Sequence, residues 1–142
     1  VSGGNRISIL EAIRAALDVS HHINFMKNQN VFGTGRVTEN VEENSKYVPL
    51  DYKQAFFLAT LGGAQALALE NKIGNFMIGK SFDALIVDTY SGSLDKFNLP
   101  AVLTENSTPE NEFQKLLQKF IYSGDDRNIA KVFVNGREVF YN

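Results

Sequence analysis

The sequence of 142 residues contains no cysteine and no tryptophan, and only two histidines, two methionines and three prolines. Without cysteine, neither a disulfide nor a thiolate metal site can form, which fits a reducing compartment such as the cytoplasm. No apolar run approaches the roughly 20 residues that span a bilayer. The formal net charge of −2 gives no electrostatic support for a nucleic acid or a membrane as a partner.

The composition is that of a globular domain. Hydrophobic residues make up 44% and charged residues 21% of the chain, as in soluble folded proteins. The length corresponds to one ordinary domain. The sequence starts with Val1, Ser2, Gly3 and Gly4 and has no initiator methionine, and a helix follows almost at once. We therefore expect a cut through the interior of a longer chain.

The first predicted helix covers residues 9–24. Residues 8–11 (SILE) form a capping box, in which the serine hydroxyl accepts from an amide and the glutamate reaches back. Apolar residues then recur at helical spacing. Residues 27–47 are polar and glycine-containing, so we expect a long loop there.

The next predicted helix starts at a second capping box, residues 51–54 (DYKQ), and extends through Leu61. We expect the glycine pair at 62–63 to break it. A short helix over residues 64–69 should follow, and its small side chains allow close backbone packing.

Strands are predicted mainly in the second half. Residues 74–79 suggest a short strand and turn, and the apolar residues 82–88 suggest a strand buried on both faces. Residues 129–134 and 137–141 form a hairpin, because the Asn-Gly pair between them suits a type I′ turn.

One amphipathic helix precedes this hairpin, over residues 109–123. Thr108 is a suitable N-cap and Pro109 suits the first helical position. Apolar residues from Phe113 to Ile121 follow the i, i+3, i+4, i+7, i+8 spacing, which predicts core or interdomain packing. Gly124 should end the helix. Residues 90–107 are predicted to be irregular.

Few side chains are candidates for chemistry. His21 and His22 are adjacent, so on a helix they point about 100° apart and cannot chelate one ion as an i, i+4 pair could. Residues 74–80 match a nucleotide-loop spacing, but a strand follows where such a loop needs a helix. A structural turn is the better interpretation, with Gly74 and Gly79 in the turn, Lys80 as a strand-end charge and Asp83 as a turn anchor.

Two other polar segments have both a functional and a structural interpretation. Residues 125–128 (DDRN) have the polar density of a site, but an Asx turn with Arg127 paired locally is the favoured interpretation. Ser2, Gly3 and Gly4 could line a pocket with backbone amides, or could form an ordinary turn.

Several segments together resemble a known family. Residues 74–88 (GNFMIGKSFDALIVD) resemble the closing signature of amidohydrolase-superfamily enzymes. Residues 1–14, 57–67 (FLATLGGAQAL), 120–129 (FIYSGDDRNI) and 132–139 (VFVNGREV) are similar to segments of guanine deaminases, which belong to that superfamily. Ala68 stands where glycine is commoner in that family, and we expect only a small packing change from it.

The resemblance implies an α/β fold. Residues 1–72 would be the helical end of a catalytic (β/α)8 barrel, starting with its last helix. Residues 73–142 would be the C-terminal strands of a small β-sandwich with one amphipathic helix, 109–123. The missing N-terminal part of the same protein is then the expected partner of this chain.

The resemblance also implies metal-dependent hydrolysis of guanine to xanthine and ammonia by a cytoplasmic homodimer, with zinc as cofactor. No catalytic or metal-binding residue is expected in this chain, and the fragment alone should be inactive and bind no zinc. The aspartate of the metal site is expected immediately before Val1, with the other ligands further upstream. Ser2, Gly3 and Gly4 would then neighbour the substrate pocket. Another nucleobase deaminase or amidohydrolase, or a non-catalytic α+β binding module, remains an alternative.

Overall fold

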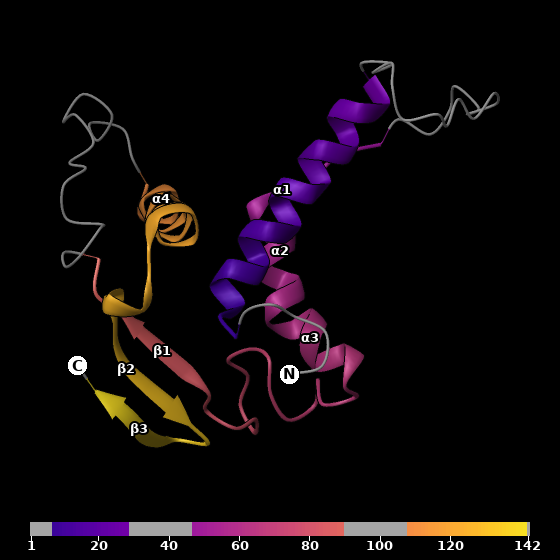
Figure 1. Cartoon of the computed structure of the whole chain (residues 1–142). Coiled ribbons are helices and arrows are strands. Elements are labelled where there is room, and N and C mark those ends of the chain that lie inside the picture. Colours follow the sequence, from indigo (N-terminus) through magenta and orange to yellow (C-terminus); the bar gives the residue numbers. More distant parts are fainter. Residues whose placement is uncertain (1–6, 29–46, 90–107, 142) are drawn as a thin grey trace. The chain divides into compact units, whose positions relative to one another are not determined.

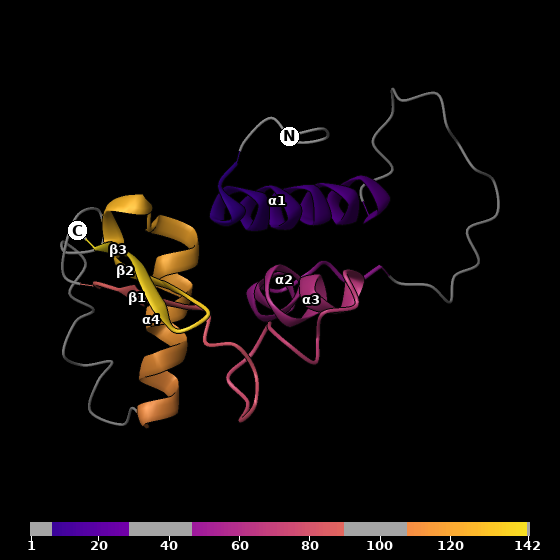
Figure 2. The same cartoon turned by 90° about the horizontal axis from the view of Figure 1, so that it is seen from below.

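The computed structural model describes residues 7–28, 47–89 and 108–141. The chain divides into two compact units, Val1–Phe56 and Phe57–Asn142. Both helices and strands are present (Figures 1 and 2). The elements are, in chain order, α1 (Ile9–Asn28), α2 (Tyr52–Ala59), α3 (Leu61–Ala66), β1 (Ala84–Val87), α4 (Pro109–Ser123), the 3-10 helix η3 (Asp126–Asn128), β2 (Ile129–Val134) and β3 (Arg137–Tyr141).

Helix α1 begins where the sequence predicts. The backbone N–H of Glu11 donates to Ser8 Oγ at 3.4 Å, and Glu11 also accepts a hydrogen bond from Arg14 at 2.7 Å. The helix continues to Asn28, beyond the predicted end at residue 24, because no glycine or proline interrupts it there. Ile13 and Leu17 are buried, as the apolar stripe requires.

A polar contact ties α1 to the segment before α2. Ser20 is buried, and its hydroxyl lies 2.7 Å from the Tyr47 hydroxyl. The same oxygen accepts a hydrogen bond from the backbone N–H of Leu50 at 2.8 Å. A buried hydroxyl is thus satisfied, and residues 47 and 50 are held against α1.

The predicted capping box of α2 is confirmed, but the predicted helix break is wrong. Gln54 N–H donates to Asp51 Oδ1 at 2.7 Å, and Asp51 N–H donates to Gln54 Oε1 at 3.0 Å. The break falls at Thr60, and both Gly62 and Gly63 lie inside α3. A Cβ atom on Gly62 would approach the backbone oxygen of Phe57 to 3.1 Å. The glycine therefore permits a tight turn between the two helices.

Strands β1, β2 and β3 form an antiparallel sheet in the order β1-β2-β3 within the described residues (Figure 1). The predicted type I′ hairpin between β2 and β3 is confirmed, because Asn135 and Gly136 have φ values of 51° and 77°. Leu85 of β1 lies opposite Val132 of β2, which lies opposite Phe140 of β3. These three apolar side chains therefore share one face of the sheet.

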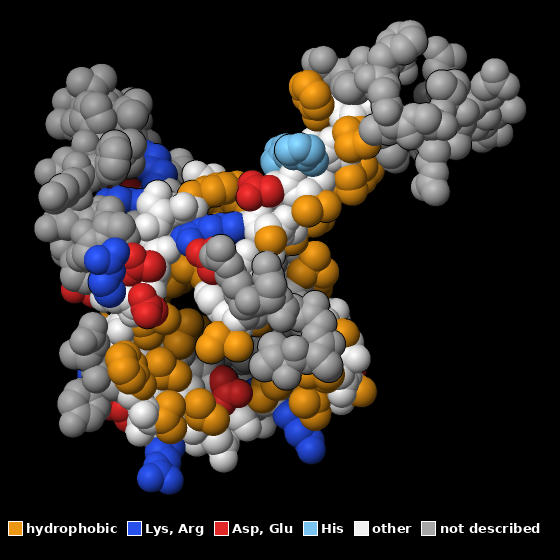
Figure 3. Space-filling model, in the orientation of Figure 1, with side chains coloured by type: hydrophobic (Ala, Val, Ile, Leu, Met, Phe, Trp, Pro, Cys, Tyr) orange, Lys and Arg blue, Asp and Glu red, His pale blue; other side chains and the backbone are white. Residues whose placement is uncertain are grey.

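The prediction that residues 82–88 form a strand buried on both faces is wrong for this chain. The strand is shorter, Ala84–Val87, and Leu85 and Ile86 are 52% and 48% exposed. Hydrophobic side chains gather at the surface over the strands in Figure 3. A run of apolar residues predicts a strand covered on both faces, but the described residues of this chain do not supply that cover. Residues 74–79 form turns and no strand.

Helix α4 matches its predicted bounds, and its start is capped as predicted. Thr108 Oγ1 accepts a hydrogen bond from Asn111 N–H at 3.3 Å, and Pro109 is the first helical residue. Gly124 ends the helix with φ −75°, which is not left-handed. Glycine is needed at position 124 for a steric reason, because an added Cβ atom would lie 2.6 Å from the backbone oxygen of Phe120. Ile121 of the apolar stripe is buried, whereas Phe113 is exposed.

Ala68 differs from expectation. It has a φ value of 56° and an exposed side chain. The alanine therefore affects backbone conformation rather than packing, and the left-handed region is unfavourable for a residue with a Cβ atom. The expectation of a small packing change was wrong.

Candidate functional site

The residues expected nearest to chemistry are not among those that the structure describes. Ser2, Gly3 and Gly4 fall outside the described ranges, and the aspartate expected before Val1 is outside the chain. The two candidate histidines are described. His21 and His22 are exposed on α1, and their adjacent positions direct them apart.

Within residues 7–28, 47–89 and 108–141, no group of three or more histidine, cysteine, aspartate or glutamate side chains could hold a metal ion. In the same ranges, no helix is both long and apolar enough to cross a membrane. The polar contacts of Lys80, Asp83, Arg127 and Asn128 join turn residues to their neighbours or to the backbone of distant segments.

Lys80 organises the turn between α3 and β1. Its ammonium group donates to Asn75 Oδ1 at 2.6 Å and lies 3.5 Å from the backbone oxygen of Ile73. Ser81 N–H closes the turn by donating to the oxygen of Lys72 at 2.8 Å. Asn75 is the partner that the sequence did not reveal, because no spacing rule links a lysine to an asparagine in an irregular turn.

Both glycines of this turn have left-handed backbones, with φ of 99° at Gly74 and 91° at Gly79. Gly74 also packs closely on α3, where an added Cβ would come within 2.8 Å of Ala64 Cβ. At Gly79 nothing lies within 4 Å of that position. Glycine is thus favoured at position 74 both by the positive φ and by the close packing on α3. At position 79 it is favoured by the positive φ alone.

Asp83 holds the hairpin between β2 and β3. Its Oδ1 accepts a hydrogen bond from Asn135 N–H at 2.7 Å. The adjacent Gly136 N–H donates to the backbone oxygen of Phe82 at 2.8 Å. Two successive amides of the turn are therefore bound by two successive residues that precede β1.

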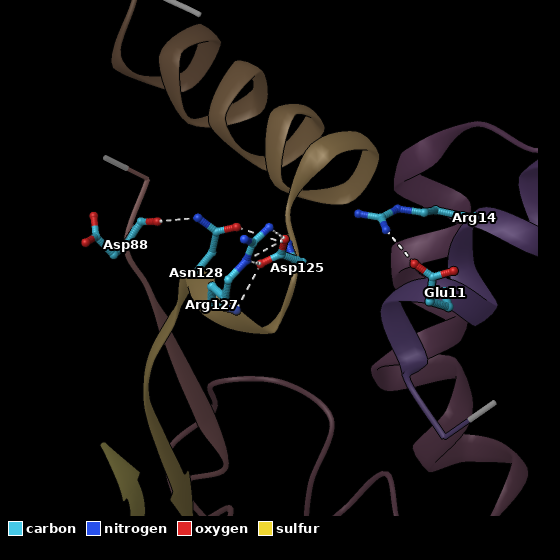
Figure 4. Close-up of polar contacts among 6 residues, drawn as sticks. All are labelled: Glu11, Arg14, Asp88, Asp125, Arg127 and Asn128. Carbon is cyan, nitrogen blue, oxygen red and sulfur yellow. Dashed lines mark hydrogen bonds and ion pairs between the residues drawn. The ribbon is translucent and has the colours of Figure 1, made fainter. Parts of the chain in front are cut away.

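Residues 125–128 fold into a local turn, as the structural interpretation predicts (Figure 4). Arg127 N–H donates to Asp125 Oδ1 at 3.0 Å, and the Arg127 guanidinium pairs with the same carboxylate. The hydrogen bond and the charge of Asp125 raise the pKa of Arg127. Because Arg127 is exposed, its ion pair contributes little to stability.

Asn128 is fully buried and links three segments (Figure 4). Its Oδ1 accepts from Asp125 N–H at 3.0 Å, and its Nδ2 donates to the Asp88 oxygen at 3.2 Å. The Asp88 N–H in turn donates to the Asn128 oxygen at 2.7 Å. This asparagine fixes the start of β2 against the end of β1, a role that the sequence did not indicate beyond a turn. The buried Asn128 amide is hydrogen-bonded through both its oxygen and its nitrogen, as buried polar groups usually are, and these bonds hold the local structure together.

The sequence profile described as "Amidohydrolase family" matches residues 4–139. The chain therefore belongs to the amidohydrolase family. Among curated relatives, the guanine deaminase of Mus musculus is 39% identical over 139 residues, which is 98% of this chain and 26% of the relative. That of Homo sapiens is 37% identical with the same coverage, and that of Dictyostelium discoideum is 35% identical over 25% of its length. The chain thus spans about a quarter of the length of these relatives.

Solved structures agree with this relationship. The guanine deaminase of C. acetobutylicum, with guanine bound in its active site, superposes with a TM-score of 0.64 at 26% identity. The match covers 99% of this chain and 26% of that one. The guanine deaminase of Bradyrhizobium japonicum has a TM-score of 0.69 at 24% identity, which indicates the shared fold alone.

Proposed function

We propose that this chain is the C-terminal part of a guanine deaminase. The observation that carries the proposal is the match to curated guanine deaminases over 98% of this chain at 35–39% identity. The alternative of a non-catalytic binding module is less favoured, because such a module would not be expected to match one enzyme family along almost its whole length.

The proposed reaction is hydrolytic. Water adds to the amino-bearing ring carbon of guanine, the exocyclic C–N bond breaks, and xanthine and ammonia leave, so that atoms balance without an oxidant or a reductant. The proposal includes the zinc ion that the resemblance implies. The described residues do not fit a metal site, since their only histidines are adjacent and exposed. We therefore assign the metal ligands, including an aspartate directly before Val1, to the preceding polypeptide.

The proposal extends to architecture. Residues 1–72 would form the helical end of the catalytic barrel, and residues 73–142 would contribute the strands β1, β2 and β3 and helix α4 to a small β-sandwich. Ser2, Gly3 and Gly4 would neighbour the substrate pocket through their position after the barrel strand. A cytoplasmic homodimer completes the proposal, and it is supported by the resemblance alone.

The test is deamination by the longer polypeptide that contains this chain and its natural upstream sequence. With zinc supplied, we expect release of ammonia and xanthine from guanine, and much slower release of ammonia from adenine or cytosine. Preference for adenine or cytosine would instead support another nucleobase deaminase. The 142-residue chain alone should release no ammonia from guanine, and robust release by it would contradict the assignment of the metal site to the upstream sequence.

A further inference from the structure

The turn between β2 and β3 consists of Asn135 and Gly136, the only Asn-Gly pair in the sequence. Both residues are exposed. An asparagine side-chain amide is lost most easily when glycine follows, because glycine has no Cβ atom to shield its backbone nitrogen. We propose that Asn135 is a site of spontaneous deamidation, and that hydrogen bonds to Phe82 and Asp83 restrain this reaction in the folded protein.

The reaction needs only water. The backbone nitrogen of Gly136 loses its proton and attacks Cγ of Asn135, and the side-chain nitrogen takes up a proton and leaves as ammonia. The product is a cyclic succinimide. Water then adds to one of the two ring carbonyl carbons and the C–N bond at that carbon breaks, which leaves either aspartate or isoaspartate. Nothing is oxidised or reduced.

Two hydrogen bonds hold the backbone nitrogens of the turn. The Asn135 N–H donates to Asp83 Oδ1 at 2.7 Å, and the Gly136 N–H donates to the Phe82 oxygen at 2.8 Å. The Gly136 nitrogen is the attacking atom, so its bond to Phe82 must break before the ring can close. Asp83 holds the neighbouring amide, and its negative charge disfavours the anionic nitrogen that the attack requires.

The backbone conformation of the turn opposes the reaction as well. Asn135 and Gly136 have φ values of 51° and 77°, as a type I′ turn requires. Ring closure needs rotation about the Cα–C bond of Asn135, which brings the Gly136 nitrogen toward Cγ and takes the residue out of that turn. Deamidation therefore proceeds from an opened turn, and its rate follows the population of the open state.

Deamidation would in turn weaken the hairpin. Isoaspartate lengthens the main chain between β2 and β3 by one carbon atom, which a two-residue type I′ turn does not accommodate. Aspartate at position 135 adds a second carboxylate to the turn that Asp83 binds, and neighbouring like charges repel. Each opening of the turn thus carries a chance of a permanent change in the hairpin. This inference does not depend on guanine being the substrate.

The test follows Asn135 in the longer polypeptide that contains this chain, incubated at neutral pH. Peptide mapping by mass spectrometry measures the conversion of Asn135 to aspartate and isoaspartate. We expect the folded protein to react more than about tenfold more slowly than the same protein unfolded in urea. Asp83→Ala should accelerate the reaction of the folded protein about fivefold or more, because the closed turn loses one hydrogen bond. Asp83→Asn keeps an acceptor oxygen and should accelerate it less.

The matched control is Thr108→Ala, which removes the N-cap hydrogen bond at the start of α4 and lowers stability by a similar amount. It should leave the rate at Asn135 unchanged. Asn128 is the internal reference within the same protein. Its side chain is buried and Ile129 follows it, so it should stay intact over the same time.

Four results would overturn the proposal. Absence of deamidation at Asn135 even in urea would remove the site itself. Equal rates in folded and unfolded protein, or no acceleration by Asp83→Ala, would remove the restraint. A slower reaction in Asp83→Ala would show that the carboxylate promotes the attack as a base. Equal acceleration by Thr108→Ala would assign the reaction to global unfolding rather than to opening of the turn.

Discussion

The carboxylate of Asp83 and the backbone N–H of Asn135 meet at 2.7 Å, although they are 52 positions apart in the sequence. Asp83 lies just before β1, after the turn that contains Gly79 and Lys80. Asn135 is the first residue of the turn between β2 and β3. The Asp83 side chain thus joins the segment that resembles the amidohydrolase signature, residues 74–88, to the hairpin of β2 and β3.

Replacing Asp83 should destabilise the sheet. Asp83→Ala removes the acceptor of a turn amide, so we expect a loss of about 1–2 kcal/mol in the free energy of unfolding. Asp83→Asn keeps an oxygen at the same place and should lose less. Urea unfolding of the 142-residue chain provides the measurement, and equal losses for both variants would mean that charge, not the hydrogen bond, matters at this position.

Asn128 should be far less replaceable than its exposed neighbour. Asn128→Ala removes the hydrogen bonds that a fully buried amide makes with the Asp125 N–H and the Asp88 oxygen, and we expect a cost of about 2–4 kcal/mol. Arg127→Gln, which removes only an exposed ion pair, is the matched control and should have a much smaller effect. Denaturant midpoints would compare the two, and a larger effect of Arg127→Gln would contradict the architectural role of Asn128.

Ala68→Gly should stabilise the chain. Glycine relieves the left-handed strain at φ 56°, and its larger unfolded-state entropy offsets part of that gain, so about 0.5–1 kcal/mol should remain. Ala66→Gly, two residues earlier and at the end of α3, should instead destabilise by up to about 1 kcal/mol. Thermal unfolding distinguishes the expected gain of stability in Ala68→Gly from the expected loss in Ala66→Gly. A loss of stability in Ala68→Gly would show that the alanine is favourable at position 68.

Gly124→Ala should be costly for a steric reason. The new Cβ atom would lie 2.5 Å from Phe120 Cδ2 and 2.6 Å from the Phe120 oxygen, so α4 must shift at its end, at a cost of about 1–3 kcal/mol. Gly79→Ala is the comparison, since its Cβ meets nothing within 4 Å and only its φ of 91° is unfavourable. If circular dichroism and urea unfolding of Gly124→Ala match the unsubstituted chain, the close contact with Phe120 is not maintained in solution.

Local sequence signals predicted local structure well. The Asn-Gly turn, the Asp51 capping box and the Thr108-Pro109 start of α4 depend on neighbouring residues alone, and all are present. The failed prediction of a helix break at Gly62 and Gly63 concerns a longer-range effect. Gly62 and Gly63 read as a helix break because glycine lowers helix propensity, but close approach to α2 requires glycine inside α3.

For the candidate site, residue types and spacings argued against a metal pair at His21 and His22 and favoured a turn at residues 125–128. They did not reveal that Lys80 binds Asn75, or that Asn128 binds Asp88. Such partners depend on how irregular segments fold back, and no periodicity encodes that.

By itself, the sequence determined the starts of α1, α2 and α4, the hairpin and the resemblance to one enzyme family, because caps, turns and motif residues act over a few positions. Tertiary structure alone decided which polar groups meet across 40 or 52 positions and which apolar side chains stay exposed. The physical reason is that long-range contacts depend on the packing of the whole chain, where burial and hydrogen bonding compete with the entropy of closing each loop.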